Sequence, residues 1–209
     1  GFVYIGEPKT AGFASIRQKG ESVSIILVLD DGQVAYGDCS TVQYAGVCDR
    51  DPPLSSADTL RLIEDELADR LVGRELSSFR ELAGEFDKLQ IGGQGLSGAV
   101  RYGLTEAILD AVAKARGQTM AGVILDEYEL PAPIGVPPIY AQSGDMRYIN
   151  LDKMILKRVD VLPHGLINNV EKKLGTKGEL LLDYLMWVKE RIRRVGDADY
   201  RPALHFDVY

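Results

Sequence analysis

Polar side chains follow three short apolar segments in the last third of the chain. They are Gln142 after residues 139–141, His164 after residues 159–162 and Asp207 after residues 203–206. An amide can orient a polar substrate, an imidazole can accept or donate a proton near neutral pH, and a carboxylate can bind a hard metal ion such as magnesium. Parallel strands would bring their carboxyl ends to one edge of a sheet, where α/β enzymes place their sites. We therefore expect Gln142, His164 and Asp207 to form a candidate site.

A simpler interpretation fits the same pattern, with three polar residues in unrelated structural roles. A histidine that follows a strand, such as His164, is often a surface or capping residue. One carboxylate does not make a magnesium site, because this ion needs near-octahedral oxygen coordination that usually comes from more than one group. The spacing alone therefore leaves both interpretations open.

The elements around these residues alternate between strand and helix. Residues 151–157 and 176–194, which lie between the apolar segments, are predicted helices. Pro163 should end the strand at 159–162, because proline cannot donate a hydrogen bond to a sheet. A strand–helix–strand–helix–strand order is typical of parallel strands joined by crossover helices.

The stretch LPAPIGVPP at residues 130–138 contains four prolines in nine residues. Proline disfavours both helix and central strand, so this stretch predicts a domain boundary. We expect an α+β domain at 1–130 and the βα units at 131–209. In the first domain, strands are predicted at 2–5, 14–17, 22–30 and 33–37, and helices at 55–71, 78–89, 97–116 and 119–127.

The loop at residues 38–53, which contains Gln43, is long for a connection inside a compact domain. Long ordered loops are often functional, although a variable surface loop would have the same composition.

Composition excludes several classes of function. The net charge of −7 argues against a nucleic acid as the main partner, since phosphate binding needs a basic face. No apolar run approaches the ~20 residues of a membrane span, and no secretory signal pattern starts at Gly1. Cys39 and Cys48 lack the partners for a zinc site and are expected to be free thiols. We therefore expect a cytoplasmic protein with no membrane and no nucleic acid as partner.

Several stretches of the sequence resemble one family, the methylaspartate ammonia-lyases of the enolase superfamily. They are AGFASIRQKGESVSIILVLDDGQVAYGDC, VQYAG, GEFDKL, RYGLTEAILDAVAKARG, YAQSGD, DVLPHGLINNVEKKLG and HFDVY. The resemblance implies an enolase-like α/β fold, in which an α+β capping domain precedes the first part of a (β/α) barrel of the TIM type. It also implies an enzyme that eliminates ammonia from threo-3-methylaspartate to give mesaconate, in glutamate degradation, with Mg²⁺ and with K⁺ as an activator. A small amino-acid substrate is then the partner, and a homodimer is expected.

The family motifs imply roles for four residues of this chain. Asp207 in HFDVY resembles the first magnesium ligand, and His164 in LPHGLINN resembles the acid–base residue on one face of the substrate. Gln142 in YAQSGD and Gln43 in VQYAG resemble substrate contacts. The loop that carries Gln43 would then be a lid over the barrel mouth.

The resemblance covers only the first part of a family member. The other magnesium carboxylates, and a lysine that serves the opposite face of the substrate, would lie beyond Tyr209. The chain also starts at Gly1 rather than at methionine and ends in the apolar run ALHFDVY. We therefore expect an N-terminal fragment that is inactive alone, because three of eight barrel strands cannot close a barrel.

Two other functions are compatible with the same residues. The first is another enolase-superfamily enzyme, a racemase or dehydratase, that abstracts a proton next to a different carboxylate. The second is a noncatalytic α/β binding module. Turnover of 3-methylaspartate distinguishes an ammonia-lyase from another enzyme of the superfamily. A magnesium titration distinguishes an enzyme from a binding module, since a binding module does not need a divalent ion.

Overall fold

The computed structural model describes residues 6–46, 50–132, 135–144 and 146–208. The strand predicted at 2–5 lies outside these residues, as does Cys48. The chain divides into two compact units, Gly1–Ala132 and Pro133–Tyr209, and each is described here by itself. No helix in the described ranges is long and apolar enough to cross a membrane.

The first unit is built on an antiparallel hairpin of β1 (Ser22–Val28) and β2 (Val34–Ser40). Gly32 in the connecting turn has a φ of 84°, a conformation that glycine adopts without steric cost. Alternate side chains of the hairpin are buried on one face, and these are Val23, Ile25, Ala35 and Cys39. The hairpin is therefore covered on one face only.

The strand predicted at 14–17 is wrong, because only Arg17 pairs there, in an isolated antiparallel bridge with Tyr44. Side chains satisfy the backbone locally instead. The Gln18 side-chain oxygen accepts from the Ala14 N–H at 2.9 Å, and the Ser15 hydroxyl donates to the Arg17 carbonyl at 2.8 Å. Such local bonds compete with the ladder of a sheet.

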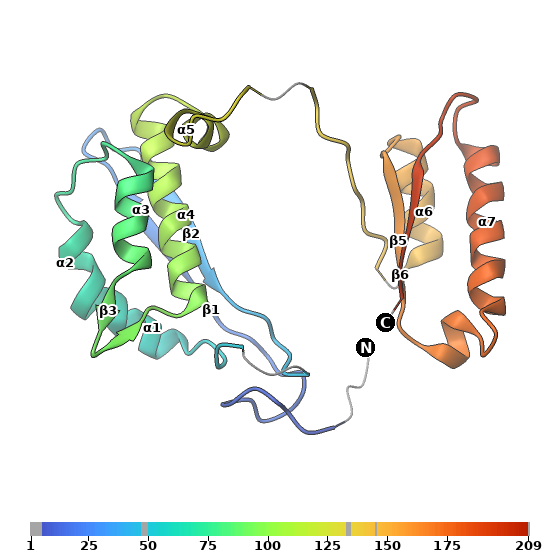
Figure 1. Cartoon of the computed structure of the whole chain (residues 1–209), viewed down its shortest axis with the longest axis horizontal. Coiled ribbons are helices and arrows are strands. Elements are labelled where there is room, and N and C mark those ends of the chain that lie inside the picture. The colour runs from blue at the N-terminus through green and yellow to red at the C-terminus, as the bar shows by residue number, and fades with distance from the viewer. Residues whose placement is uncertain (1–5, 47–49, 133–134, 145, 209) are drawn as a thin grey trace. The chain divides into compact units, whose positions relative to one another are not determined.

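Helices cover the buried face of the hairpin (Figure 1). They are α1 (Ser56–Leu62), the π-helical turn η1 (Ile63–Leu67), α2 (Ala68–Leu71), α3 (Phe79–Asp87), α4 (Gly98–Ala115) and α5 (Met120–Glu127). A small hairpin of β3 (Gln90–Ile91) and β4 (Gln94–Gly95) precedes α4. The four helical regions predicted for this unit are confirmed, with shifts at their ends.

Helix α4 lies along the edge of β2 that faces away from β1. The Tyr36 and Asp38 N–H groups donate to the carboxylates of Asp110 and Glu106, at 2.9 and 3.1 Å. The Lys114 ammonium donates to the Val34 carbonyl at 2.6 Å. These bonds satisfy backbone groups that an edge strand otherwise leaves unpaired.

Two glycines allow this close approach. A Cβ atom at Gly103 would lie 2.5 Å from the Cys39 backbone nitrogen and 2.7 Å from its Sγ, and a Cβ at Gly37 would collide with the Gly103 carbonyl. The helix and the strand therefore contact each other through their backbones. A clash caused by an added Cβ atom could not be relieved by rotating a side chain.

We expect Gly103→Ala to destabilise this unit by about 2 kcal/mol. Overpacking costs typically ~1–3 kcal/mol and occasionally more, whereas alanine recovers only about 1 kcal/mol of helix propensity. Urea unfolding followed by circular dichroism measures the difference. Gly84→Ala in α3 is the matched control, because no atom lies within 4 Å of a Cβ added there, and it should stabilise by ~0.5–1 kcal/mol. Equal stability of the two variants would contradict the backbone contact.

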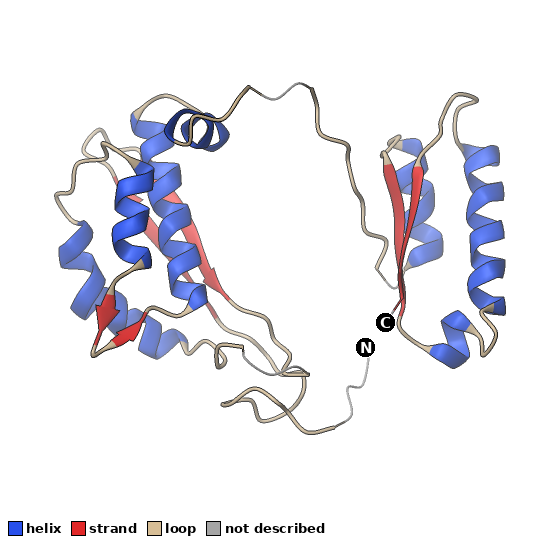
Figure 2. Ribbon diagram, in the orientation of Figure 1, coloured by secondary structure: helices blue, strands red, loops and turns tan. Residues whose placement is uncertain are grey.

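The second unit alternates strands and helices, as predicted. Its elements are α6 (Arg147–Leu156), β5 (Val161–Ile167), the π-helical turn η2 (Val170–Leu174), α7 (Glu179–Val195) and β6 (Ala203–Val208). Strands β5 and β6 pair in parallel (Figure 2). The segment predicted as a strand at 139–141 makes one parallel bridge to β5, at Tyr140, rather than a continuous ladder, and a second bridge follows at Gly144. The predicted parallel order is confirmed.

The core of this unit lies on one face of β5 and β6. It combines side chains of α6, β5 and α7, namely Leu151, Met154, Ile155, Leu162, Ile167, Tyr184 and Val188. Phe206 of β6 packs edge-on against the Tyr184 ring at 5.7 Å. Because side chains alternate along a strand, His205 and Asp207 face away from this core.

Strand β5 does not end at Pro163 as predicted. It continues through Pro163 and His164 to Ile167, with a shift of register between Pro163 and Gly165. The Pro163 carbonyl still accepts a hydrogen bond, from the Ser143 N–H at 2.8 Å. Proline removes only one donor from the ladder, and the bulge at His164 restores the pairing beyond it.

Candidate active site

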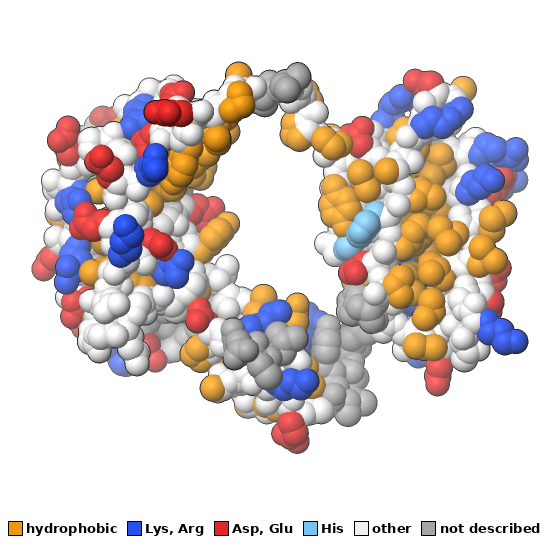
Figure 3. Space-filling view, viewed as in Figure 1, with side chains coloured by type: hydrophobic (Ala, Val, Ile, Leu, Met, Phe, Trp, Pro, Cys, Tyr) orange, Lys and Arg blue, Asp and Glu red, His pale blue; other side chains and the backbone are white. Residues whose placement is uncertain are grey.

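His164 and Asp207 lie side by side on the face of β5 and β6 that is opposite the core. His164 Nε2 is 3.9 Å from Asp207 Oδ2, with 15% of the imidazole and 39% of the carboxylate exposed. The structure thus brings together an imidazole and a carboxylate that are distant in sequence. In Figure 3 the pale blue histidine side chains reach the surface of this unit among hydrophobic groups.

The backbone at His164 is strained. Its φ of 40° is unusual for a residue with a Cβ atom. The Ser143 hydroxyl donates to the His164 carbonyl at 3.4 Å, which helps to hold this conformation. Strained positions of this kind concentrate at functional sites, so the bulge supports a functional role for His164.

Gln142 lies next to Ser143, whose backbone and side chain bind the carbonyls of Pro163 and His164. The Gln142 side chain is exposed. Of the three residues expected to converge, the structure therefore places His164 and Asp207 in proximity and Gln142 on the segment hydrogen-bonded to β5.

His205 and Tyr140 complete the cluster, and the sequence reasoning missed both. The Nδ1 atoms of His164 and His205 are 2.8 Å apart, and the two rings are nearly parallel, with centroids 4.9 Å apart and an interplanar angle of 15°. The Tyr140 hydroxyl lies 3.3 Å from His205 Nδ1. The available signal was the spacing in HFDVY, since His205 and Asp207 two residues apart in a strand must share a face.

Tyr140 is a hydrogen-bond donor at neutral pH. Partial burial and the negative charge of Asp207 both raise the pKa of its phenol above the ordinary value of 10.0. The ring edge of Tyr140 also contacts both imidazoles, with centroid distances of 5.2 Å to His164 and 5.5 Å to His205. The Tyr140 ring therefore packs against the side of both imidazoles and limits their movement.

Asp207 could supply one ligand to a metal ion, but the described residues do not supply the others. Among the residues that the structure describes, it forms no ion pair with a lysine or arginine, and the imidazole of His164 lies 3.9 Å from its carboxylate. No group of three or more His, Cys, Asp or Glu side chains in the same ranges is arranged to hold a metal ion. These residues could fill one coordination position of a magnesium ion, but they do not form a complete magnesium site.

Gln43 lies in the first unit, in an exposed part of the loop after β2. Its carbonyl accepts from the Gln18 N–H at 3.0 Å, and its side chain packs on Gly20, where a Cβ would lie 2.6 Å from Gln43 Cγ. Farther along, Asp51 accepts from the Gly98 N–H at 2.6 Å, at the start of α4. The loop is thus anchored on both sides of residues 47–49, which lie outside the described residues.

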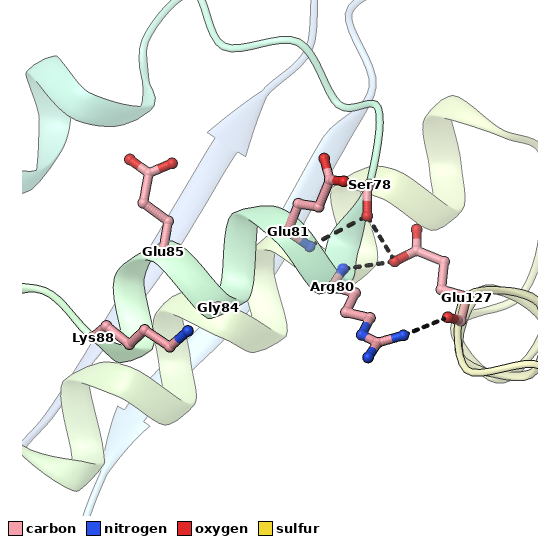
Figure 4. Close-up of a pocket in the computed structure, with 7 residues that line it drawn as sticks. All are labelled: Ser78, Arg80, Glu81, Gly84, Glu85, Lys88 and Glu127. Atoms are coloured by element: carbon pink, nitrogen blue, oxygen red, sulfur yellow. Dashed lines mark hydrogen bonds between the residues drawn. The ribbon is translucent and has the colours of Figure 1, made fainter.

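A surface cavity of about 620 Å³ lies in the first unit, between α3 and α5 (Figure 4). Its lining residues are Ser78, Arg80, Glu81, Gly84, Glu85, Lys88 and Glu127. The Glu127 carboxylate accepts from the N–H groups of Phe79 and Arg80, at 2.9 and 2.6 Å, and so caps α3. Because this carboxylate is already saturated with donors, we assign the cavity a structural role.

The cap at Glu127 makes stability depend on pH. Burial opposes ionisation of this carboxyl, but hydrogen bonds from the Arg80 and Phe79 N–H groups and the Ser78 hydroxyl, together with the Arg116 charge, lower its pKa below the ordinary 4.5. A lowered folded-state pKa stabilises the fold above the unfolded-state value, and the effect disappears as the pH falls through the folded-state value.

We therefore expect Glu127→Gln to cost about 1–3 kcal/mol at pH 7. Its difference from the wild type should shrink below pH 4.5, the ordinary pKa of this carboxyl. Denaturant unfolding at several pH values measures both effects. Glu81→Gln removes the same charge from an exposed position on α3 and should change stability little. A Glu127→Gln difference that is independent of pH would contradict the role of the ionised carboxylate.

Two family models together match nearly the whole chain. The model described as the methylaspartate ammonia-lyase N-terminus matches residues 1–129, and the model described as its C-terminus matches residues 133–209. The chain is 56% identical over 210 residues to the methylaspartate ammonia-lyase of Clostridium tetanomorphum. The alignment covers all of the chain and 51% of that protein, so the chain spans about half the length of the curated relatives it matches.

Solved structures give the same result. The Mg complex of β-methylaspartase from C. tetanomorphum matches with a TM-score of 0.87 at 56% identity, over the whole chain and 51% of that structure. The Citrobacter amalonaticus enzyme containing (2S,3S)-3-methylaspartic acid matches with a TM-score of 0.88 at 50% identity, over the whole chain and 51% of that structure. Muconate lactonizing enzyme from Pseudomonas putida matches at 18% identity with a TM-score of 0.51, over 90% of the chain and 46% of that structure. This distant likeness confirms the predicted fold, an α+β unit followed by the first βα units of an enolase-like architecture.

Proposed function

Because this chain belongs to the methylaspartate ammonia-lyase family, we propose that the complete polypeptide containing it eliminates ammonia from threo-3-methylaspartate to give mesaconate. The observation that carries the proposal is the contact between His164 and Asp207 on the polar face of two parallel strands. The Citrobacter relative that contains (2S,3S)-3-methylaspartic acid supports the substrate.

The chemical difficulty of this elimination is the hydrogen on carbon 3, which lies beside a carboxylate and is only weakly acidic. His164 takes this proton from the diastereomer whose carbon-3 hydrogen faces the imidazole. The electron pair of the C–H bond forms the double bond to carbon 2, and the C–N electron pair leaves with ammonia. An imidazole suits this step, because its unperturbed pKa of ~6.5 allows proton exchange near neutral pH.

Asp207 would supply one of the ligands of a magnesium ion, with the remaining ligands outside this chain. The Mg complex of the Clostridium relative supports this assignment. When bound, magnesium neutralises negative charge that develops on the substrate carboxylate. Potassium as an activator rests on the family resemblance, and no described residue is assigned to it.

Gln142 and Gln43 are proposed substrate contacts. Both have exposed side chains, and an amide can donate to a carboxylate and accept from an ammonium group. We also propose that β5 and β6 are early strands of a closed TIM-type barrel in the complete polypeptide, that the enzyme is a cytoplasmic homodimer, and that neither nucleic acid nor membrane is a partner.

A substrate panel tests the proposed function. The complete polypeptide is assayed with magnesium against threo-3-methylaspartate and against other carboxylic acids with an acidic hydrogen beside the carboxylate. Mesaconate and ammonia should form in equal amounts from 3-methylaspartate alone. Racemisation or dehydration of another acid, without ammonia, would instead support a different enzyme of the superfamily, and calorimetry that detects no magnesium binding would support a binding module.

A further inference from the structure

The two histidines of the chain are bonded to each other through the same ring atom. With His164 Nδ1 and His205 Nδ1 at 2.8 Å, a single proton must lie between them, since two N–H groups would repel and two lone pairs would not bind. One histidine therefore donates and the other accepts. This contact couples the tautomer of one ring to that of the other.

We propose that His205 is a positioning residue for His164. In this arrangement His205 Nδ1 accepts the proton of His164 Nδ1 at 2.8 Å, in preference to that of the Tyr140 hydroxyl at 3.3 Å. The lone pair of His164 Nε2 then remains available for the hydrogen of the substrate. The assignment rests on the proposed function, because it presumes that His164 transfers a proton.

The geometry selects Nε2 as the working atom. Nδ1 of His164 is occupied by His205, whereas Nε2 lies toward Asp207, at 3.9 Å from its carboxylate. A histidine base needs an unprotonated nitrogen toward its substrate, and a hydrogen bond at the opposite nitrogen is the common way to secure it.

His205 is well placed to orient the imidazole of His164, whose backbone lies at a bulge. His164 lies at a bulge with a φ of 40°, whereas His205 belongs to the regular strand β6. The planes of the two rings differ by only 15°, and the Tyr140 ring contacts both. Functional groups carried on rigid elements keep their geometry better than those on irregular segments.

A purely structural role does not explain His205. Its side chain is exposed and faces away from the core that Phe206 and Tyr184 form on the other side of β6. Substitution at His205 therefore removes no packing against the helices of this unit.

Two variants of the complete enzyme separate the hydrogen bond from the ring. His205→Phe keeps a planar ring but has no acceptor, whereas His205→Asn loses the ring and keeps a side-chain oxygen close to the position of Nδ1. Both are assayed with magnesium on 3-methylaspartate and on its epimer at carbon 3. His164→Ala identifies the diastereomer whose proton His164 handles.

On that diastereomer, His205→Phe should lower kcat by ~10–100-fold, the range for a residue that orients another, with KM nearly unchanged. The other diastereomer should keep its rate, and His205→Asn should recover most of the loss. In a His164→Ala background, His205→Phe should have no further effect, because it acts through His164. The unfolding midpoint of each variant confirms that it is folded.

Three results would overturn the assignment. They are an unchanged ratio of rates in His205→Phe, an equal loss on both diastereomers, and a His205→Asn variant as impaired as His205→Phe. A wild-type enzyme that turns over neither diastereomer would overturn the proposed function itself, and the assignment with it. Turnover by the wild type with an unaffected His205→Phe would overturn the assignment alone.

Discussion

Asp207→Asn in the complete enzyme should lower kcat/KM on threo-3-methylaspartate by about a thousand-fold or more. The amide keeps the shape of the side chain but removes the negative charge that binds magnesium. Lewis-acid stabilisation of a developing anion is worth several kcal/mol, and ~4 kcal/mol corresponds to a factor of about a thousand in rate. The wild type and the variant are compared by the appearance of mesaconate at saturating magnesium.

The matched control for this charge change is Asp183→Asn. Asp183 is exposed on α7, on the helical side of the strands, and its substitution should leave turnover unchanged. Partial rescue of Asp207→Asn by higher magnesium concentration would agree with a ligand role. Turnover by Asp207→Asn at the wild-type rate would contradict it.

His164→Ala should act selectively on one of the two diastereomers that differ at carbon 3. General acid–base groups contribute typically ~10²–10⁴-fold, and the loss should fall in this range for the diastereomer whose proton faces the imidazole. The family resemblance places the group for the opposite face beyond Tyr209, so the other diastereomer should be much less affected. Initial rates on both diastereomers give the ratio directly.

His164→Asn controls for the strained backbone at this position. Asparagine adopts positive φ more readily than alanine, so it preserves the bulge while removing the base. Both variants should lose the same diastereomer. Equal loss on both diastereomers would indicate substrate binding rather than proton transfer, and full activity of both variants would return His164 to a structural role.

The regular elements of this chain could be predicted because their signals are local. The apolar spacing in residues 97–116 predicts a helix whatever it packs against, and α4 follows at Gly98–Ala115. The alternation of strand and helix after the proline-rich stretch predicted the parallel pairing of β5 and β6. The segment 14–17 was misassigned because side-chain bonds to its own backbone replace sheet pairing there.

The contact between His164 and His205 could not be predicted in this way. It depends on the register between β5 and β6, in which Pro163 pairs with His205 and the chain then bulges at His164. A shift by one residue turns every side chain of a strand to the opposite face. No sequence rule places such a bulge, so the spacing in HFDVY puts His205 on the face of Asp207 but does not predict its contact with His164.

A crystal structure of the complete polypeptide with magnesium and mesaconate tests the central claim most directly, that the polar face of β5 and β6 carries the chemistry. We expect a magnesium ion at about 2.1 Å from an Asp207 carboxylate oxygen. We also expect His164 Nε2 within about 3.5 Å of the carbon that carries the methyl group. A magnesium ion bound away from Asp207, or an imidazole of His164 out of reach of that carbon, would contradict it.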